Sequence, residues 1–207
     1  HDPCNACGSS DGLAVYEDHS YCFVCHQHTK ADGVVSQSSH PMNYVSYQGQ
    51  ATSLKNRGLS EKTCQMYKIL KDGKILRFYY HDKSGRPIGA KTKTTNKIFS
   101  YEGDTDGTFF GQHLFPDKGK RVVIFEGELD AATAYQCMEG WPMVSLPTGA
   151  ASAKKSIQKN LQWLQGYEEI VLFFDNDEAG IHASTEAASV LPPGKVKIAR
   201  LTAFKDA

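Results

Sequence analysis

The stretch VVIFEGELD, residues 122–130, runs from an apolar strand through a turn into a helix and carries three carboxylates. A similar change occurs in IVLFFDNDEAG, residues 170–180, where two aspartates follow the apolar run. The remaining apolar strands and the helical stretches between strands are predicted at 143–146 and 196–201, and at 129–139, 152–164 and 179–190. This alternation predicts an α/β domain with a mainly parallel sheet.

Carboxylates follow the strands of this predicted sheet. Glu126 ends the first strand, Asp130 comes four residues later, Asp175 and Asp177 follow another strand, and Asp206 follows the last one. Because neighbouring parallel strands lie about 4.8 Å apart, side chains at their carboxyl ends can converge on hard cations such as magnesium. One such acid alone would more simply cap a helix. Five of them indicate a metal site for phosphoryl transfer.

Two C-x2-C pairs near the N-terminus predict a structural zinc site. Its ligands are Cys4, Cys7, Cys22 and Cys25. Four thiolates form a closed tetrahedral shell, whereas the alternative, a pair of disulfides, requires an oxidising compartment for which the sequence has no signal. Short strands at 13–16 and 20–23 complete a zinc ribbon. Cys64 and Cys137 lie outside this pattern, and we expect both to be small buried residues.

The composition predicts four parts. Residues 1–30 form the zinc-binding domain, and residues 31–41 are Ser-rich and predict a flexible linker. Residues 42–119 form a basic amino-terminal subdomain of mixed α+β structure, and residues 120–207 form the α/β catalytic subdomain.

The basic subdomain has a lysine-rich extended run. A helix capped by Ser60 is predicted near residues 60–67, and a hairpin with a turn at Gly85 is predicted over residues 75–90. Lys91, Lys93 and Lys97 follow, and we expect them to be exposed on one face, because alternate strand residues point the same way.

Charge is distributed unevenly although the formal net charge is zero. Residues 51–121 carry fifteen basic and seven acidic side chains, whereas residues 122–207 carry seven basic and eleven acidic ones. A basic middle beside an acidic site suits a polyanionic partner, although a solvated lysine-rich face would give the same counts. No apolar run has transmembrane length, so we expect a soluble intracellular protein; His1 at the start and Ala207 at the end suggest a fragment of a longer one.

Together these motifs resemble a known family. EGELD at 126–130 and FDNDEAG at 174–180 are similar to the Toprim signature of primases, topoisomerases and related nucleases. The cysteine ribbon, the Ser-rich linker, VSLPTGAASAKK at 144–155 and KDA at 205–207 extend the similarity. Over nearly its whole length, the chain resembles the primase half of phage primase–helicases.

The resemblance implies roles for individual residues. The magnesium ligands are implied to be Glu126, Asp175, Asp177 and Asp206, with Asp130 in support. Whether Glu126 is a ligand or a general base is left open. Lys91 and Lys97 match residues that contact nucleotide or template, and Lys93 shares their predicted face. In the ribbon, His19 matches a template-reading position, and Tyr21 is a second candidate for that role.

The implied activity is that of a DNA primase, which synthesises short RNA primers from ribonucleoside triphosphates on a single-stranded DNA template. Two catalytic magnesium ions are expected, with manganese as a substitute. The implied partners are a helicase domain in the same full-length chain and a replicative DNA polymerase. The implied location is the host cytoplasm, away from membranes.

Two alternatives share parts of the pattern. A recombination mediator also joins a zinc element to a Toprim-like domain, but it only binds DNA and does not require the full acidic set. A Toprim nuclease shares the carboxylates. Primer synthesis from nucleotides distinguishes the primase from both.

Overall fold

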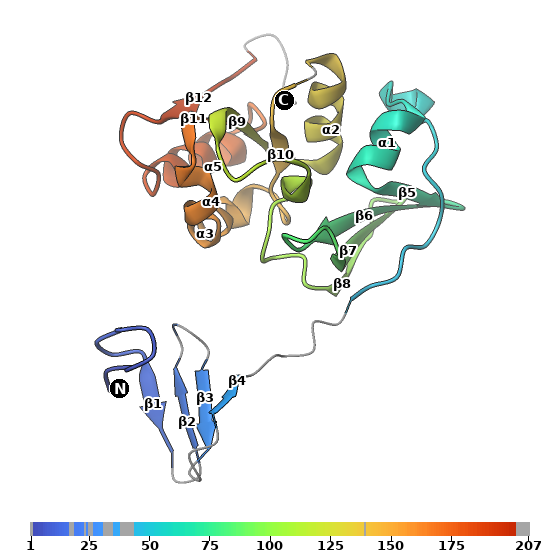
Figure 1. The fold of residues 1–207 in the computed structure, drawn as a ribbon. Coiled ribbons are helices and arrows are strands. Elements are labelled where there is room, and N and C mark those ends of the chain that lie inside the picture. Colours follow the sequence, from blue (N-terminus) through green and yellow to red (C-terminus); the bar gives the residue numbers. More distant parts are fainter. Residues whose placement is uncertain are drawn as a thin grey trace. The chain divides into compact units, whose positions relative to one another are not determined.

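A computed structural model of the chain describes residues 2–16, 19–22, 24, 27–30, 35–37, 44–138 and 140–201. The chain divides into two compact units, His1–Met42 and Asn43–Ala207, each with its own strands (Figure 1). Along the described parts, no helix has the length and apolar character that crossing a membrane requires.

The first unit is a four-stranded antiparallel sheet. Its strands follow one another in chain order and are β1 (Leu13–Val15), β2 (His19–Cys22), β3 (Gln27–Lys30) and β4 (Val35–Gln37). The two strands predicted for the ribbon correspond to β1 and β2. The flexible linker expected over residues 31–41 contains β4, because Val35 pairs with Thr29 and extends the sheet by one strand. β-Branched residues such as Val35 favour strand pairing, but the Ser-rich composition of this stretch led us to predict a linker instead of a strand.

The second unit begins with an antiparallel sheet in the order β5-β6-β7-β8. These strands are β5 (Ile69–Asp72), β6 (Ile75–His81), β7 (Pro87–Thr94) and β8 (Phe99–Gly103). The predicted hairpin is confirmed: β6 and β7 join through a turn in which Asp82 Oδ1 accepts hydrogen bonds from the N–H groups of Ser84 and Arg86. Helix α1 (Glu61–Tyr67) precedes β5, and Ser60 caps it as predicted.

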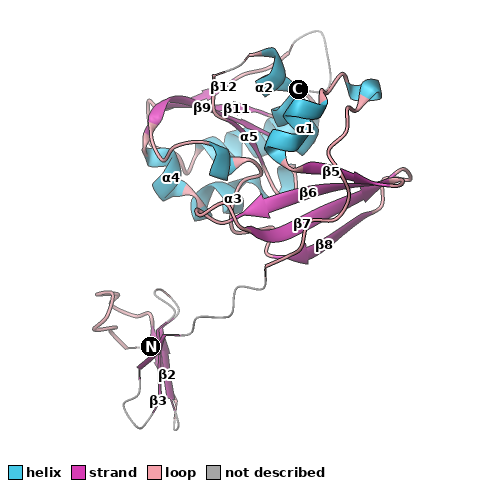
Figure 2. Cartoon of the chain, turned by 45° about the vertical axis from the view of Figure 1, so that its right-hand side comes forward, coloured by secondary structure: helices cyan, strands magenta, loops and turns pink. Residues whose placement is uncertain are grey.

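The rest of this unit is a parallel sheet with helices on both faces, as Figure 2 shows. Its order is β10-β9-β11-β12, with β9 (Gly119–Phe125), β10 (Met143–Ser145), β11 (Tyr167–Phe173) and β12 (Val196–Ile198). The main helices are α2 (Glu128–Cys137), α3 (Ala153–Lys159), α4 (Leu161–Gln165) and α5 (Glu178–Ala188). The α/β class with a mainly parallel sheet is thereby confirmed. The single helix predicted over 152–164 divides at Asn160, whose side chain donates to the Ser156 carbonyl.

Alternation along β9 assigns the two faces of the parallel sheet. Val122 and Ile124 point into a core formed with α3, α4 and α5, whereas Val123 and Phe125 point toward α2. A third core joins the two sheets. It contains Tyr67 of α1, whose hydroxyl donates to the Met143 carbonyl at 2.8 Å.

The two cysteines outside the ribbon differ in burial. Cys64 lies in the core between the sheets, as expected. Cys137 is exposed, contrary to our expectation, because it is the last residue of α2 and lies beyond the part of the helix that packs on the sheet.

A pair of histidines packs beside the antiparallel sheet. The His81 and His113 rings lie 3.8 Å apart between centroids, and the Tyr47 hydroxyl is 2.7 Å from His81 Nε2. Burial lowers the pKa of His81 to about 3, with the neighbouring His113 and Lys68 adding to the effect. Burial, followed by the charge of Lys68, lowers the pKa of His113 to about 4. Both rings are therefore neutral in the folded protein at neutral pH.

This pair predicts a loss of stability in mild acid. The unfolded chain takes up protons near the ordinary histidine pKa of 6.5, whereas the folded chain takes them up only near pH 4 and 3. The stabilising contribution is complete above pH 6.5 and is lost as the pH falls toward these values. Urea unfolding between pH 7 and 4.5 should show it, with a slope of up to roughly 1.4 kcal/mol per pH unit for each histidine.

Two variants test whether the histidine pair causes this pH dependence of the free energy of unfolding. His113→Gln should flatten the pH dependence, whereas His182→Gln, at an exposed position of α5, should leave it unchanged. An unchanged slope in His113→Gln would show that other groups cause the acid sensitivity.

Candidate functional site

Carboxylates gather at the carboxyl edge of the parallel sheet. Phe125 and Phe173 are paired neighbours on β9 and β11, so the chain leaves both strands at the same edge, toward Glu126 and Asp175 respectively. Burial raises the pKa of Glu126, and the charges of Asp175 and, more weakly, Asp177 raise it further. The structure thus brings together three of the five acids that the sequence predicted for this edge.

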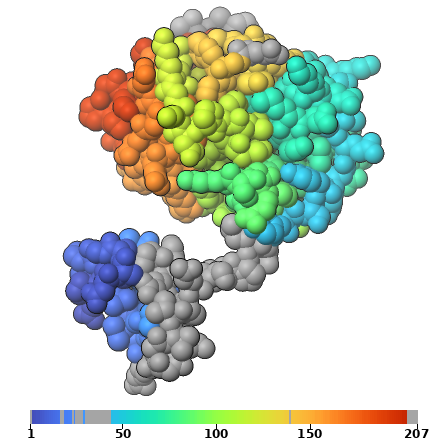
Figure 3. All heavy atoms as spheres, viewed as in Figure 1, coloured from blue at the N-terminus to red at the C-terminus, as the bar shows by residue number. Residues whose placement is uncertain are grey.

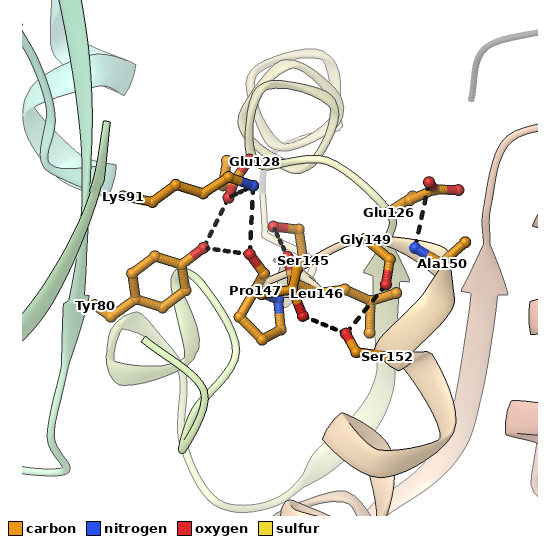
Figure 4. A network of polar contacts seen from close by, with 11 residues as sticks. Tyr80, Lys91, Glu126, Glu128, Ser145, Leu146, Pro147, Gly149, Ala150 and Ser152 are labelled. Atoms are coloured by element: carbon orange, nitrogen blue, oxygen red, sulfur yellow. Dashed lines mark hydrogen bonds and ion pairs between the residues drawn. The ribbon is translucent and has the colours of Figure 1, made fainter. Parts of the chain in front are cut away.

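The two oxygens of Glu126 have different surroundings. Oε1 accepts a hydrogen bond from the Ala150 N–H at 3.3 Å (Figure 4). Oε2 is buried and completes no hydrogen bond of normal geometry among the residues described, although the backbone N–H of Asp175 is close enough to the carboxylate to lower the pKa of Glu126 slightly, against the larger effect of burial. A buried carboxylate oxygen without a full hydrogen bond is unfavourable, and a hard cation would satisfy it. The donor set therefore fits a divalent cation.

Asp177 and Asp130 both lie where a helix begins. Asp177 is the N-cap of α5, and its Oδ1 accepts from the Gly180 N–H at 3.0 Å. Asp130 lies in the first turn of α2 with its carboxylate folded back against Gly127, so tightly that a Cβ at position 127 would collide with it. Asp206, the fifth predicted acid, lies outside the described residues.

A buried ion pair connects the two sheets beside this edge. Lys91 Nζ on β7 lies 2.7 Å from Glu128 Oε1 at the start of α2, and the Tyr80 hydroxyl donates to the same oxygen at 2.7 Å (Figure 4). Lys91 and Tyr80 both also donate to the Pro147 carbonyl, at 3.3 and 3.4 Å. Our expectation that Lys91 is exposed is wrong: it is only 8% exposed, because Glu128 compensates its charge.

The segment that contains Pro147 also contacts Glu126. Pro147 accepts from Lys91 and Tyr80, and three residues later the Ala150 N–H donates to Glu126. Gly149 between them has a φ of +74°, a backbone conformation that favours glycine. Sequence reasoning missed Glu128 and Tyr80. The repeated glutamate in EGELD was the available signal, but its partners are remote in the chain.

The other two lysines have different surroundings. Lys93 shares the face of Lys91, and its Nζ lies 5.5 Å from the centroid of the Phe99 ring. Burial lowers the pKa of Lys93, and the positive charge of Arg57 adds to this. Lys97 follows β7 in a turn with a φ of +59°, so it does not continue the strand face as we expected.

Three of the four predicted zinc ligands converge in the first unit. The sulfurs of Cys4, Cys7 and Cys22 all lie within 4.8 Å of one another, and those of Cys7 and Cys22 are 3.7 Å apart. Sulfurs bound at about 2.3 Å to a tetrahedral ion are separated by roughly 3.8 Å. The Gly8 N–H donates to the Cys4 carbonyl and closes the turn between the first two ligands. The cluster therefore suits a metal ion. Cys25 lies outside the described residues.

The two candidate template-reading residues lie on β2. His19 and Tyr21 are two residues apart on this strand and therefore share a face. The His19 ring stacks on Tyr16, with 4.5 Å between centroids and an angle of 16° between the planes. Both candidates are partly accessible to solvent.

Comparison with known proteins identifies the family. Residues 123–207 match a Toprim-like family. The DNA helicase/primase of Enterobacteria phage T3 is 37% identical over 222 residues, which cover 97% of this chain and 39% of the phage protein. The primase fragment of the bacteriophage T7 primase-helicase is 36% identical with a TM-score of 0.73, and the alignment covers 100% of this chain and 91% of the fragment. The chain belongs to the primase part of the phage primase–helicase family.

This assignment confirms the resemblance inferred from the motifs, and homology to these phage primases supports DNA primase function. A second T7 structure contains the lagging-strand DNA polymerase interacting with the primase domains of two subunits bound to an RNA/DNA hybrid and dTTP. The matched chain of that structure is 38% identical to this one with a TM-score of 0.71, and the alignment covers 77% of this chain and 83% of the matched chain. The chain spans about two fifths of its T3 relative. The match to a Toprim-like family implies use of a divalent metal.

The buried pair predicts that Lys91 and Glu128 depend on each other. Lys91→Ala or Glu128→Ala should each lower the free energy of unfolding by roughly 3–5 kcal/mol, because one buried charge then loses its partner. In the double variant Lys91→Met/Glu128→Leu the loss should be smaller than the sum of the two. Urea unfolding measures all three. Single-variant losses within about 0.5 kcal/mol, as at exposed sites, would contradict the pairing.

Proposed function

We propose that this chain synthesises short RNA primers on single-stranded DNA by template-directed transfer of ribonucleotides. The observation that carries the proposal is Glu126, whose buried Oε2 lacks a hydrogen bond of normal geometry and lies beside Asp175 and Asp177 at the sheet edge. A cluster of negative charge with such an oxygen needs a cation, and the family relationship directs that cation to phosphoryl transfer.

Magnesium is the proposed ion, in two positions, with manganese as a substitute. Glu126, Asp175, Asp177 and Asp206 would hold it, with Asp130 in support. When bound, the ions would activate a 3′-hydroxyl and stabilise the departing pyrophosphate. Asp177 has a second function in this proposal, since its bond to Gly180 fixes the direction in which α5 leaves the site.

The basic residues would neutralise phosphates. Lys93 and Lys97 are proposed to contact the nucleotide or the template, because both lie at the end of β7 nearest α2. Lys91 faces the same region with its charge compensated by Glu128, so in the unliganded protein it orients the segment around Pro147.

The ribbon would select the starting site. We propose that Cys4, Cys7, Cys22 and Cys25 bind one structural zinc ion, and that His19 and Tyr21 read the template from β2. The face shared by these two residues supports this assignment. We also retain residues 42–119 as the basic subdomain and 120–207 as the catalytic one.

The relatives suggest the partners. The T3 relative is named a helicase/primase and is much longer than this chain, so we propose that a helicase domain belongs to the same full-length protein. The T7 complex motivates a replicative DNA polymerase as a second partner. The host cytoplasm is the proposed site of action.

The proposal predicts that charge at positions 175 and 177 is essential for synthesis. Asp175→Asn and Asp177→Asn should each lower ribonucleotide incorporation on single-stranded templates by at least about 100-fold, roughly 2.7 kcal/mol of barrier. Asparagine caps helices as well as aspartate, so Asp177→Asn should leave α5 intact. Glu178→Gln, at the exposed first residue of α5, is the matched control and should remain active. Near-normal synthesis by both asparagine variants would leave capping as their role and favour a DNA-binding mediator.

The ribbon predicts one zinc per chain. Elemental analysis of purified protein should find it, and Cys7→Ser should lower the content, because a hydroxyl is a much poorer ligand than a thiolate. Cys64→Ser and Cys137→Ser should retain the metal. A zinc content near zero in the unaltered protein would contradict the site.

A further inference from the structure

Two adjoining hollows form one groove beside helix α1. The first has a volume of about 490 Å³ and is lined by residues that include Tyr47 and Lys68. The second, of about 580 Å³, lies between the segment 114–121 and the end of α2. Met66 and Leu114 line both hollows, so the two share a wall. In Figure 3 the turquoise residues of α1 and the yellow-green segments that include residues 114–121 adjoin on the face in view.

The groove lies at the end of the parallel sheet opposite the candidate active site. Gly119 and Arg121 line it from the start of β9, whereas Glu126 follows the last residue of that strand. The strand spans roughly 20 Å. Trp141 lines the groove just before β10 begins. None of the described residues assigned to the candidate active site lines the groove, so a ligand there would leave the acidic edge free.

Lysines flank the groove without acidic partners. They are Lys62 and Lys68 in the first hollow and Lys118 and Lys120 in the second. Of the described residues that line either hollow, none carries a carboxylate, and no ion pair among the described residues includes these four lysines. Arg121 also lines the groove, but Glu169 compensates its charge. The four lysines repel one another, and a bound acidic group would relieve the repulsion.

The floor of the groove is apolar. Its side chains are those of Met66, Leu114, Phe115, Tyr135 and Trp141, and all of them are partly accessible to solvent. Covering such side chains with a ligand stabilises a complex by roughly 25 cal/mol per Å² of apolar surface. A free phosphate or sulfate would contact the lysines and leave this floor uncovered. The groove therefore suits a ligand that carries acidic and apolar groups together.

The aromatic rings of the floor already have partners on their faces. The Arg121 guanidinium lies 4.4 Å from the centroid of the Trp141 ring, and the Phe115 and Tyr135 rings pack against each other with 5.9 Å between centroids. Tyr67 packs against both of these rings. Because proteins commonly bind single nucleic-acid strands by stacking bases on free ring faces, this packing disfavours a nucleic acid as the ligand. An apolar protein side chain needs only the edges of the rings.

We propose that this groove docks an extended, acidic segment of a partner protein, whose carboxylates pair with the four lysines and whose apolar side chains pack on the floor beside Trp141. Opposite charges bring the segment to the groove, and burial of its apolar side chains holds it there. Two adjoining hollows suit a segment of several residues better than a single side chain. The inference goes beyond the proposed function and does not depend on it, because the described lining residues lie away from the acidic edge.

Labelled peptides test the apolar requirement. Fluorescence anisotropy measures their affinity for the whole zinc-containing protein, without DNA or nucleotides. The probes are fluorescein-labelled peptides of about ten residues, roughly 33 Å when extended, in which glutamate alternates with alanine and one central position is leucine, phenylalanine or tryptophan. At least one of them should bind about 10-fold more tightly than the peptide with alanine at that position, because its apolar side chain is buried on the floor. Equal affinity for all the peptides would indicate attraction by charge alone and would contradict the groove.

Charge reversal of two exposed lysines tests where the peptides bind. Lys62→Glu in the first hollow and Lys120→Glu in the second should each weaken binding of the tightest peptide by about 10-fold. Lys154→Glu, at an exposed position of α3 that lines neither hollow, changes the net charge equally and should have no effect. A loss in only one of the two groove variants would overturn the continuous groove, and a loss in neither would place the peptides elsewhere.

Further measurements distinguish other occupants. Primer synthesis and binding of labelled oligo-deoxythymidylate by the two groove variants should match those of Lys154→Glu. If the groove variants lose DNA affinity instead, the groove is a nucleic-acid surface and the docking proposal is wrong. If the unaltered chain self-associates in sedimentation velocity and Lys120→Glu abolishes this, a second copy is the occupant and the partner is wrong. If the groove variants lose the peptides but the unaltered protein makes no primers, the docking groove stands and the primase proposal fails.

Discussion

The buried pair of Lys91 and Glu128 is the constraint on which the site depends. Two charges removed from water are tolerated only when their remaining hydrogen-bonding groups are satisfied, and here Tyr80 and the Pro147 carbonyl complete the set. These partners come from β6, β7, α2 and the segment after β10. The pair therefore fixes the antiparallel sheet against the parallel one, and it fixes the segment whose Ala150 N–H orients Glu126. The geometry of the acidic edge is set by a contact outside it.

The N-terminal turns of α2 and α5 stabilise the carboxylates of the candidate site as well as beginning the helices. Helices α2 and α5 begin immediately after the strand ends, so their positive ends face Glu128, Asp130 and Asp177. That field partly offsets the repulsion among carboxylates, and Asp177 gains a capping bond as well. Glu126 lies outside both helices, and burial together with the charge of Asp175 raises its pKa. The helix starts thus stabilise most of the carboxylates at this edge, and Glu126 is the acid that lacks this stabilisation.

Features governed by local pattern were predictable from the sequence, and features governed by distant partners were not. The strand at Val122–Phe125, the Ser60 cap and the acids at the sheet edge each follow from periodicity or from residues a few positions apart. The burial of Lys91 depends on a glutamate 37 residues away, and lysines are otherwise expected at the surface. The break at Asn160 and the exposure of Cys137 likewise depend on where helices meet the sheet. The individual site roles remain predictions.

Although the net charge of the chain is zero, its basic and acidic side chains lie in different parts of the fold. Cations such as Lys55, Arg57 and Lys74 concentrate at one end of the antiparallel sheet, while carboxylates concentrate at the edge of the parallel sheet. Lys91 and Glu128 form a direct, buried ion pair, which compensates one charge of each kind. In the proposed function, the remaining cations would contact phosphates and the remaining carboxylates would hold the metal, and phosphoryl transfer on a nucleic-acid strand requires both.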